Sequence, residues 1–219
     1  MPEESTQPDD RRELFENWAP NYDNSIDDIA QAENFPFAGY DQVMDGICQE
    51  MTAEPGMSVL DIGTGTGNLA RRVLDLGCRV CGTDLSASML EKAREKIPEA
   101  TLLEADLRES WPSSIDGPYD RIVSAFVLHE FDLKKKISIL LEAAQRLSPG
   151  GKIVIGDVAF PTHDDFERAH QRWHDRWDET EHYWVAETAL EAAQQSGLLG
   201  RWIEVSTCAG IFIFQTQTK

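Results

Sequence analysis

Apolar and polar positions alternate in blocks from about residue 57 onward. Short apolar runs predict strands, and they fall at Ser58–Ile62, Arg79–Thr83, Ala100–Glu104, Tyr119–Ser124 and Lys152–Asp157. Between them, apolar residues recur at helical spacing in Asn68–Leu76, Ser86–Ile97 and Leu133–Leu147. Strands that alternate with helices are typical of parallel strands joined by right-handed crossovers, so the pattern predicts a doubly wound α/β fold.

The end of the chain has a different pattern. Two β-rich runs, Trp202–Cys208 and Gly210–Gln215, follow one another with almost nothing between them. A connection that short permits an antiparallel pair but not a parallel crossover. We therefore expect a seven-stranded, mostly parallel, Rossmann-like sheet that ends in a C-terminal antiparallel hairpin.

The first 55 residues look helical, with Phe35-Pro36-Phe37 as a break. They predict an N-terminal helical cap over residues 11–55. Residues 1–10 are polar and acidic, the reverse of a signal peptide, and we expect them to form a disordered tail. Because no internal repeat or low-complexity linker interrupts the rest, residues 11–219 are predicted to form a single domain with its α/β core at 56–219.

The charge of the chain limits its partners. Acidic residues outnumber basic ones 39 to 20 among 219 residues, and the formal net charge is −19. Such a field repels phosphate backbones, so nucleic acid is not an expected partner. No apolar run approaches the roughly 20 residues that a membrane-spanning helix needs. We therefore expect a cytoplasmic protein, a monomer or homodimer, without nucleic-acid or membrane partners.

Two pairs of residues have the spacing of metal ligands. Cys78 and Cys81 form a Cys-x-x-Cys pair, but residues three apart on a strand face opposite sides, so we interpret them as buried thiols. His170 and His174 lie four apart on a predicted helix, without the Glu of the H-E-x-x-H arrangement. We predict no metal site from either pair.

A glycine-rich loop follows the first predicted strand at once, as Gly63-Thr64-Gly65-Thr66-Gly67, and leads into a helix. Glycines in this position let the loop turn sharply and let backbone N–H groups approach a ligand closely. The dinucleotide fingerprint is G-x-G-x-x-G, whereas this loop is G-x-G-x-G with Asn68 next. The spacing therefore disfavours an NAD-dependent oxidoreductase.

Two carboxylates follow the next two predicted strands. Asp84 lies at the end of the second strand, where a carboxylate can accept both hydrogen bonds of a ribose diol. Asp106 lies just after the third strand, where it could accept a hydrogen bond from an adenine amine. An Asp at a helix N-terminus would occupy the position of Asp84 equally well, and the two roles are compatible.

These three motifs, in this order, resemble the cofactor motifs of class I S-adenosylmethionine-dependent methyltransferases over roughly residues 55–216. The family's usual sheet also has seven strands and a final antiparallel hairpin. The resemblance implies that the cofactor is S-adenosylmethionine. It also implies that the cofactor contacts Asp61, Gly63, Thr64, Gly65, Gly67, Asp84, Leu85, Ala105, Asp106, Leu107, Ser124 and Ala125.

The N-terminus suggests a closer resemblance. The segments Leu14–Asp23 and Phe37–Asp41 are similar to those of small bacterial methyltransferases of the YrrT type, which are often associated with methionine and cysteine recycling. In that family the N-terminal helices fold over the cofactor. The resemblance implies that Tyr22 and Tyr40 line the pocket near the methionyl end of the cofactor, and it makes Tyr22 a candidate catalytic residue. Trp18 is better explained as an apolar contact with the domain.

The methyl acceptor is less well specified. Methyl transfer needs a general base only if the acceptor carries a proton at neutral pH. The resemblance places Leu128 and His129 beside the acceptor, and His129 could be a base, a substrate-binding group or the cap of a turn. An aromatic and His-rich stretch at 157–184 predicts either a lid helix over an apolar or planar acceptor or, through Trp173 and Trp177, contacts with the core.

The sequence therefore predicts a methyltransferase that acts on a small molecule. Two alternatives remain open. The chain could be a non-catalytic module that binds S-adenosylmethionine or S-adenosylhomocysteine, or its acceptor could be a protein, especially a basic one, given the acidic surface.

Overall fold

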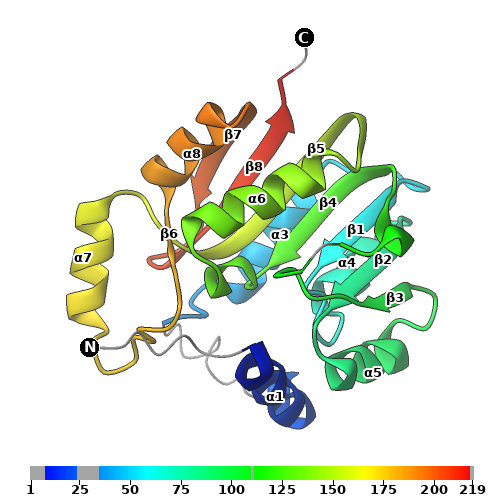
Figure 1. Cartoon of the computed structure of the whole chain (residues 1–219), viewed down its shortest axis with the longest axis horizontal. Coiled ribbons are helices and arrows are strands. Elements are labelled where there is room, and N and C mark those ends of the chain that lie inside the picture. Colours follow the sequence, from blue (N-terminus) through cyan, green and yellow to red (C-terminus); the bar gives the residue numbers. More distant parts are fainter. Residues whose placement is uncertain (1–7, 24–34, 110, 218–219) are drawn as a thin grey trace.

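The computed structural model describes residues 8–23, 35–109 and 111–217 (Figure 1). Its sheet has the order β3-β2-β1-β4-β5-β8-β7, with a short strand β6 paired to β5 outside this path. The strands are β1 (Ser58–Ile62), β2 (Arg79–Asp84), β3 (Thr101–Glu104), β4 (Tyr119–Ala125), β5 (Leu147–Phe160), β6 (Trp184–Val185), β7 (Leu198–Glu204) and β8 (Ala209–Thr216). Strands β1 to β5 are parallel, and β8 is antiparallel to both β5 and β7. The predicted doubly wound sheet with a C-terminal hairpin is confirmed.

Helices cover both faces of this sheet (Figure 1). The longer ones are α1 (Pro8–Trp18), α3 (Tyr40–Glu50), α4 (Asn68–Asp75), α5 (Ala87–Lys96), α6 (Leu133–Ala144), α7 (His163–Arg172) and α8 (Ala186–Gln195). Short 3-10 turns are η1 (Ala19–Asn21), η2 (Ser113–Ile115) and η3 (Leu128–Glu130). None of the helices in the described ranges is long and apolar enough to cross a membrane.

Alternate residues along the strands belong to two hydrophobic clusters, one on each face of the sheet. Val59 of β1 belongs to the cluster that contains residues of α3 and α4, whereas its neighbour Leu60 belongs to the cluster that contains residues of α6 and α8. Val154 and Ile155 of β5 divide in the same way. Because successive side chains of a strand point to opposite faces, strands buried on both sides become continuous apolar runs. This is why the central strands could be read from the sequence.

Several element boundaries differ from the prediction. Helix α6 ends at Ala144 and β5 already begins at Leu147, because Pro149 and the glycines after it take part in the start of a strand. Strand β7 begins at Leu198, four residues before the predicted start at Trp202. Helix α8 and strand β6 were not predicted, since α8 buries only alanines and β6 has two residues.

Of the predicted helical cap over residues 11–55, the structure describes α1 and η1 up to Asp23 and a turn at residues 35–39 that leads into α3, whereas residues 24–34 lie outside the described residues. Helix α1 begins at Pro8, so the last three residues of the predicted tail are helical. Residues 1–7 lie outside the described residues. Helix α1 lies beside α5, at the edge where the parallel strands end (Figure 1).

Candidate functional site

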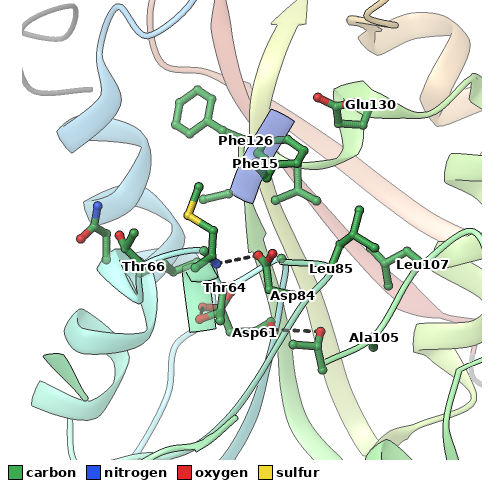
Figure 2. A pocket seen from close by; sticks show the side chains of 18 of the residues that line it. Phe15, Asp61, Thr64, Thr66, Asp84, Leu85, Ala105, Leu107, Phe126 and Glu130 are labelled. Carbon is green, nitrogen blue, oxygen red and sulfur yellow. Dashed lines mark hydrogen bonds between the residues drawn. The ribbon is translucent and has the colours of Figure 1, made fainter. Parts of the chain in front are cut away.

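The carboxyl ends of β1, β2 and β4 and the loop after β3 surround a cavity, the first cavity. Twelve of the fourteen predicted cofactor residues line it, namely Tyr22, Tyr40, Asp61, Gly63, Thr64, Gly65, Asp84, Leu85, Ala105, Asp106, Leu107 and Ala125. Figure 2 shows Asp61, Asp84 and Ala105 at one end of this cavity and Phe15, Phe126 and Glu130 at the other. Ligands of open α/β sheets bind in this crevice beyond the strand ends.

The two remaining predicted residues do not line the first cavity. Gly67 has φ +88° and forms the N-terminal cap of α4, where a Cβ would lie 3.0 Å from Cδ1 of Ile97. The hydroxyl of Ser124 donates a 2.7 Å hydrogen bond to the carbonyl of Ile62 and is fully buried. Both residues hold the surrounding elements together.

The glycine loop is held by strand β2 and by the chain after β4. The N–H of Thr64 donates to the carbonyl of Thr83 at 2.8 Å. Gly63 has φ +68°, and a Cβ there would lie 2.4 Å from Cγ2 of Val127, so this glycine is required by packing as well as by backbone conformation. Gly65 has φ +54° and faces open space, because no side chain or backbone atom of the described residues beyond its chain neighbours lies within 4 Å of a Cβ built there. A ligand can approach the backbone closely at Gly65.

Asp84 closes the loop from the end of β2. Its Oδ2 accepts a 2.8 Å hydrogen bond from the N–H of Gly65, and its Oδ1 accepts a 2.9 Å bond from the N–H of Ser86. Burial raises the pKa of Asp84, and the bonds from Ser86 and Gly65 oppose this rise. Each oxygen retains a second lone pair, so the carboxylate can accept further bonds from a ligand in the cavity.

Asp61 is buried at the floor of the first cavity. Its Oδ2 accepts a 2.7 Å bond from the hydroxyl of Thr64, and its Oδ1 has no hydrogen-bond partner among the residues that the structure describes. Burial raises the pKa of Asp61 to about 7, and the Asp84 carboxylate adds to this rise. An unpaired buried oxygen is costly, and a donor from a ligand would satisfy it.

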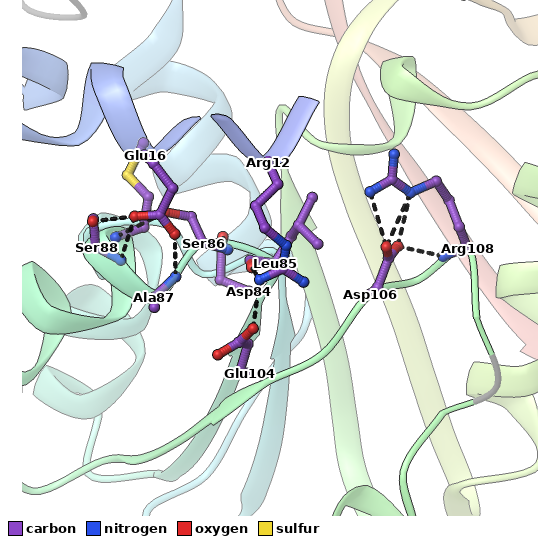
Figure 3. Close-up of polar contacts among 11 residues, drawn as sticks. Arg12, Glu16, Asp84, Leu85, Ser86, Ala87, Ser88, Glu104, Asp106 and Arg108 are labelled. Atoms are coloured by element: carbon purple, nitrogen blue, oxygen red, sulfur yellow. Dashed lines mark hydrogen bonds and ion pairs between the residues drawn. The ribbon is translucent and has the colours of Figure 1, made fainter. Parts of the chain in front are cut away.

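Asp106 forms hydrogen bonds with Arg108, a residue that was not predicted to belong to the site. The guanidinium of Arg108 donates to both carboxylate oxygens of Asp106, at 2.9 Å from Nε and 2.8 Å from Nη2 (Figure 3). Burial acts to raise the pKa of Asp106, but the bonds from Arg108 outweigh it and lower the pKa. Any ligand that hydrogen-bonds to Asp106 therefore meets a carboxylate already paired with an arginine.

Helix α1 closes one side of the first cavity. Its Glu16 accepts hydrogen bonds from the N–H groups of Ala87 and Ser88, at 2.9 and 3.1 Å, at the start of α5 (Figure 3). Arg12 donates to the carbonyl of Leu85 at 2.8 Å. A carboxylate at a helix N-terminus is stabilised by the unsatisfied N–H groups and the helix dipole. These contacts fix α1 over the residues that follow β2.

The segment after α1 is tied to the glycine loop. The carboxylate of Asp23 accepts from the hydroxyl of Thr66 at 2.6 Å, from the amide of Asn68 at 3.1 Å and from Lys96 at 2.9 Å. Asn68 also donates to the hydroxyl of Tyr40 at 3.2 Å. Tyr22, next to Asp23, is thereby placed at the wall of the first cavity.

A second cavity adjoins the first. Five residues line both cavities, namely Arg11, Phe15, Tyr22, Phe126 and Glu130. Trp18, Phe37, His129 and Glu181 are among the residues that line only the second. Its wall thus contains both aromatic side chains and ionisable groups.

His129 faces the second cavity, and a buried carboxylate fixes its ring. Nδ1 of His129 lies 2.6 Å from Oδ1 of Asp157, and the backbone N–H of His129 donates to Oδ2 of Asp157 at 2.9 Å. Trp184 donates to the same Oδ2 at 3.0 Å. Burial lowers the pKa of His129, but the Asp157 carboxylate outweighs it, and the pKa rises to about 9. The ring is therefore held by Asp157 rather than bonded to the following turn.

Most of the aromatic and His-rich stretch lies away from both cavities, and only Asp178 and Glu181 near its end line the second one. Helix α7 ends at Arg172, so the predicted helical pairing of His170 with His174 is wrong. His170 instead lies 2.9 Å from Glu179 at the surface. Trp173 and Trp177 stack on Phe35 with ring centroids 5.1 and 5.2 Å away, which favours core contacts over a lid.

Several residues that line the first cavity were not predicted from the sequence. Arg11 and Phe15 belong to α1, whose position depends on contacts made only in the folded chain. Phe126, with φ +55°, stacks on Tyr40 at 5.3 Å and lies where the two cavities meet.

Comparisons with known proteins show that the chain is similar to methyltransferases. Residues 59–151 match a family described as a methyltransferase domain. The chain is 36% identical over 158 residues to an uncharacterized methyltransferase of Geobacillus kaustophilus, covering 72% of this chain and 71% of that protein. It is 35% identical over 175 residues to one of Geobacillus thermodenitrificans, covering 77% and 79%.

Solved structures share the fold. The magnesium protoporphyrin IX methyltransferase of Synechocystis PCC 6803, solved with bound S-adenosylhomocysteine, has a TM-score of 0.73 at 18% identity, covering 93% of this chain and 97% of that one. A DhpI-SAM-HEP complex has a TM-score of 0.70 at 20% identity, covering 94% and 95%. Fold, family match and relatives together show that this chain belongs to the class I S-adenosylmethionine-dependent methyltransferases.

Proposed function

We propose that this enzyme transfers the methyl group of S-adenosylmethionine to a small-molecule acceptor bound in the second cavity. The observation that carries this proposal is that Tyr22, Phe126 and Glu130 line both cavities. A cofactor in the first cavity would present its methyl group where the two cavities meet. An acceptor in the second cavity would then lie in line with the breaking carbon–sulfur bond.

The residues of the first cavity fit the cofactor. Asp84 would accept the two ribose hydroxyls, and the backbone of Gly65, which faces open space, would lie against the methionyl part. The unpaired Oδ1 of Asp61 would accept a hydrogen bond from the cofactor's ammonium group. Ala105, Asp106 and Leu107 would bind the adenine.

The enzyme's own contribution is alignment and exclusion of water. S-adenosylmethionine supplies an activated methyl group when bound. Tyr22 and Phe126 would position the methyl group between the cavities, and helix α1 would cover it. His129 lines the second cavity. Because its pKa is raised to about 9, its ring carries a proton near neutral pH and would orient the acceptor as a hydrogen-bond donor.

The test is methyl transfer from isotopically labelled S-adenosylmethionine into an extract separated into metabolite and protein fractions. We expect label in the metabolite fraction, with thiols, amines and acids assayed separately. Asp84→Ala should lose this activity, and Asp75→Ala, which changes an exposed Asp on α4, should keep it. Label in the protein fraction alone would replace this proposal with a protein acceptor. Binding of S-adenosylhomocysteine without any transfer would favour a non-catalytic module.

A further inference from the structure

Three potential metal ligands meet in the second cavity. They are a ring nitrogen of His129 and one carboxylate oxygen each from Glu130 and Glu181, and all three atoms lie within 4.8 Å of one another. Nε2 of His129 is the nitrogen near Glu181, 3.9 Å from its Oε1. His129 and Glu130 come from η3, whereas Glu181 comes from the segment that precedes β6. Imidazole nitrogen and carboxylate oxygens are the usual ligands of divalent first-row transition metals.

His129 is prepared for this role by the contacts of its other nitrogen. The ring is only 7% exposed, and Asp157 holds Nδ1 at 2.6 Å. Nε2 makes no hydrogen bond to any residue in the described ranges, and the carboxylate of Glu181 lies 3.9 Å away from it. Histidines that bind metals typically bond a carboxylate through the second nitrogen in this way, which fixes the ring and its tautomer.

Glu181 is held beside His129 by the backbone. The N–H of His182 donates a 2.6 Å hydrogen bond to the carbonyl of His129. The carbonyl of His182 in turn accepts a hydrogen bond from the buried Lys136 of α6. The two segments that carry the three donors are therefore fixed to each other independently of any ligand.

We propose that His129, Glu130 and Glu181 bind one divalent transition-metal ion in the second cavity. One nitrogen and two oxygens leave coordination positions open toward the cavity, where water or a heteroatom of an acceptor can bind. Ligand atoms about 2.1 Å from one tetrahedral ion lie about 3.4 Å apart. The three donor atoms lie within 4.8 Å of one another, so the most distant pair needs to close by up to about 1.4 Å.

The charges around the cluster favour a cation. The carboxylates of Glu130, Glu181 and Asp178 line the second cavity. The guanidinium of Arg11 lines the same cavity. Nε of Arg11 lies 3.1 Å from Oε2 of Glu130, so this arginine competes with the ion for one oxygen. The ion would bind the other oxygen of Glu130 or displace Arg11.

The test is calorimetric titration of the untagged, full-length, chelator-treated protein with ZnCl2 and, separately, MnCl2 at pH 8. We expect one ion per chain for at least one of the two metals. His129→Ala and Glu181→Gln should each weaken binding by at least about tenfold. The matched controls, His170→Ala and Glu179→Gln, remove the same residue types from the exposed His170–Glu179 pair and should leave binding unchanged.

Circular dichroism and S-adenosylhomocysteine binding on the same samples establish that each variant is folded. Absence of stoichiometric binding of both metals to the wild type would overturn the proposal. Equal loss of affinity in the control variants would also overturn it, since the ion would then bind at the surface. Because the readout is metal binding, the result is independent of whether an acceptor for methyl transfer is found.

Discussion

The backbone N–H of Gly65 donates a 2.8 Å hydrogen bond to Oδ2 of Asp84, so the glycine loop and the end of β2 hold each other in place. The proposed ribose ligand is therefore also a structural support of the loop. The N–H of Thr64 adds a second connection through the carbonyl of Thr83. A substitution that removes the Gly65–Asp84 hydrogen bond should therefore disturb both the glycine loop and the end of β2.

Asp84→Ala should weaken S-adenosylhomocysteine binding by about 1–3 kcal/mol, or roughly 5- to 150-fold in Kd, because it removes the acceptor of the ribose bonds and of the loop N–H. Isothermal titration calorimetry measures this change. Asp75→Ala is the control, since Asp75 is an exposed residue paired with Arg71. An unchanged Kd in Asp84→Ala would contradict the ribose assignment.

Gly65→Val should abolish cofactor binding. Gly65 has φ +54°, which a β-branched residue rarely adopts, and the new side chain would occupy the open space of the first cavity. Gly56→Val is the matched control, because Gly56 has φ +90° and also has no atom within 4 Å of a Cβ. Both variants carry backbone strain, so both should unfold at lower temperature, but only Gly65→Val should lose binding. Retained binding in Gly65→Val would place the cofactor elsewhere.

The parts of the fold that follow from local pattern were predictable. Strand β1 matches its predicted range, Ser58–Ile62, because a strand buried on both faces is a continuous apolar run bounded by a glycine loop. The position of Asp84 was predictable for a similar reason, since the end of β2 fixes where its carboxylate lies. Helix α8 gave no such signal because its buried residues are alanines.

The second cavity could not be predicted, because its walls come from distant segments. Glu181 lies beside His129 only because a loop returns to η3 after helix α7. Arg108 is only two residues from Asp106, yet no pattern shows that its side chain turns back onto that carboxylate. Contacts of this kind depend on the paths of loops, which hydrophobic periodicity does not encode.

Asp61→Asn should change how stability depends on pH. Burial raises the pKa of Asp61 from 3.8 to about 7, so between these values the folded state binds more protons than the unfolded state, and stability falls as pH rises. Above about pH 7 the ionised carboxylate destabilises the free enzyme by up to about 4 kcal/mol. Asn cannot ionise, so the stability of the variant relative to wild type should increase from pH 4 to 7 and then level off. Urea unfolding across this range measures it, and a pH-independent difference would contradict the raised pKa.

Glu16→Ala should weaken cofactor binding through the position of α1. Glu16 accepts hydrogen bonds from the N–H groups of Ala87 and Ser88, and these bonds fix α1 against α5 (Figure 3). Without them, the covering position of α1 is less populated, and affinity falls in proportion to that population. We expect Kd for S-adenosylhomocysteine to rise about three- to tenfold, mainly through faster dissociation measured by stopped flow. This rise is smaller than the about 1.5–3 kcal/mol of a bond to a charged acceptor, because the Asp23 contacts with the glycine loop also hold this segment.

The matched control for this prediction is Glu13→Ala, which removes an exposed Glu from the same helix. Both substitutions raise helix propensity by a similar amount and remove one negative charge, so a general effect on α1 or on long-range electrostatics would appear in both. Faster dissociation confined to Glu16→Ala would show that the anchor to α5 keeps α1 over the cofactor. Equal dissociation rates in the two variants would mean that Phe15 and the Asp23 contacts with the glycine loop suffice to hold this segment closed.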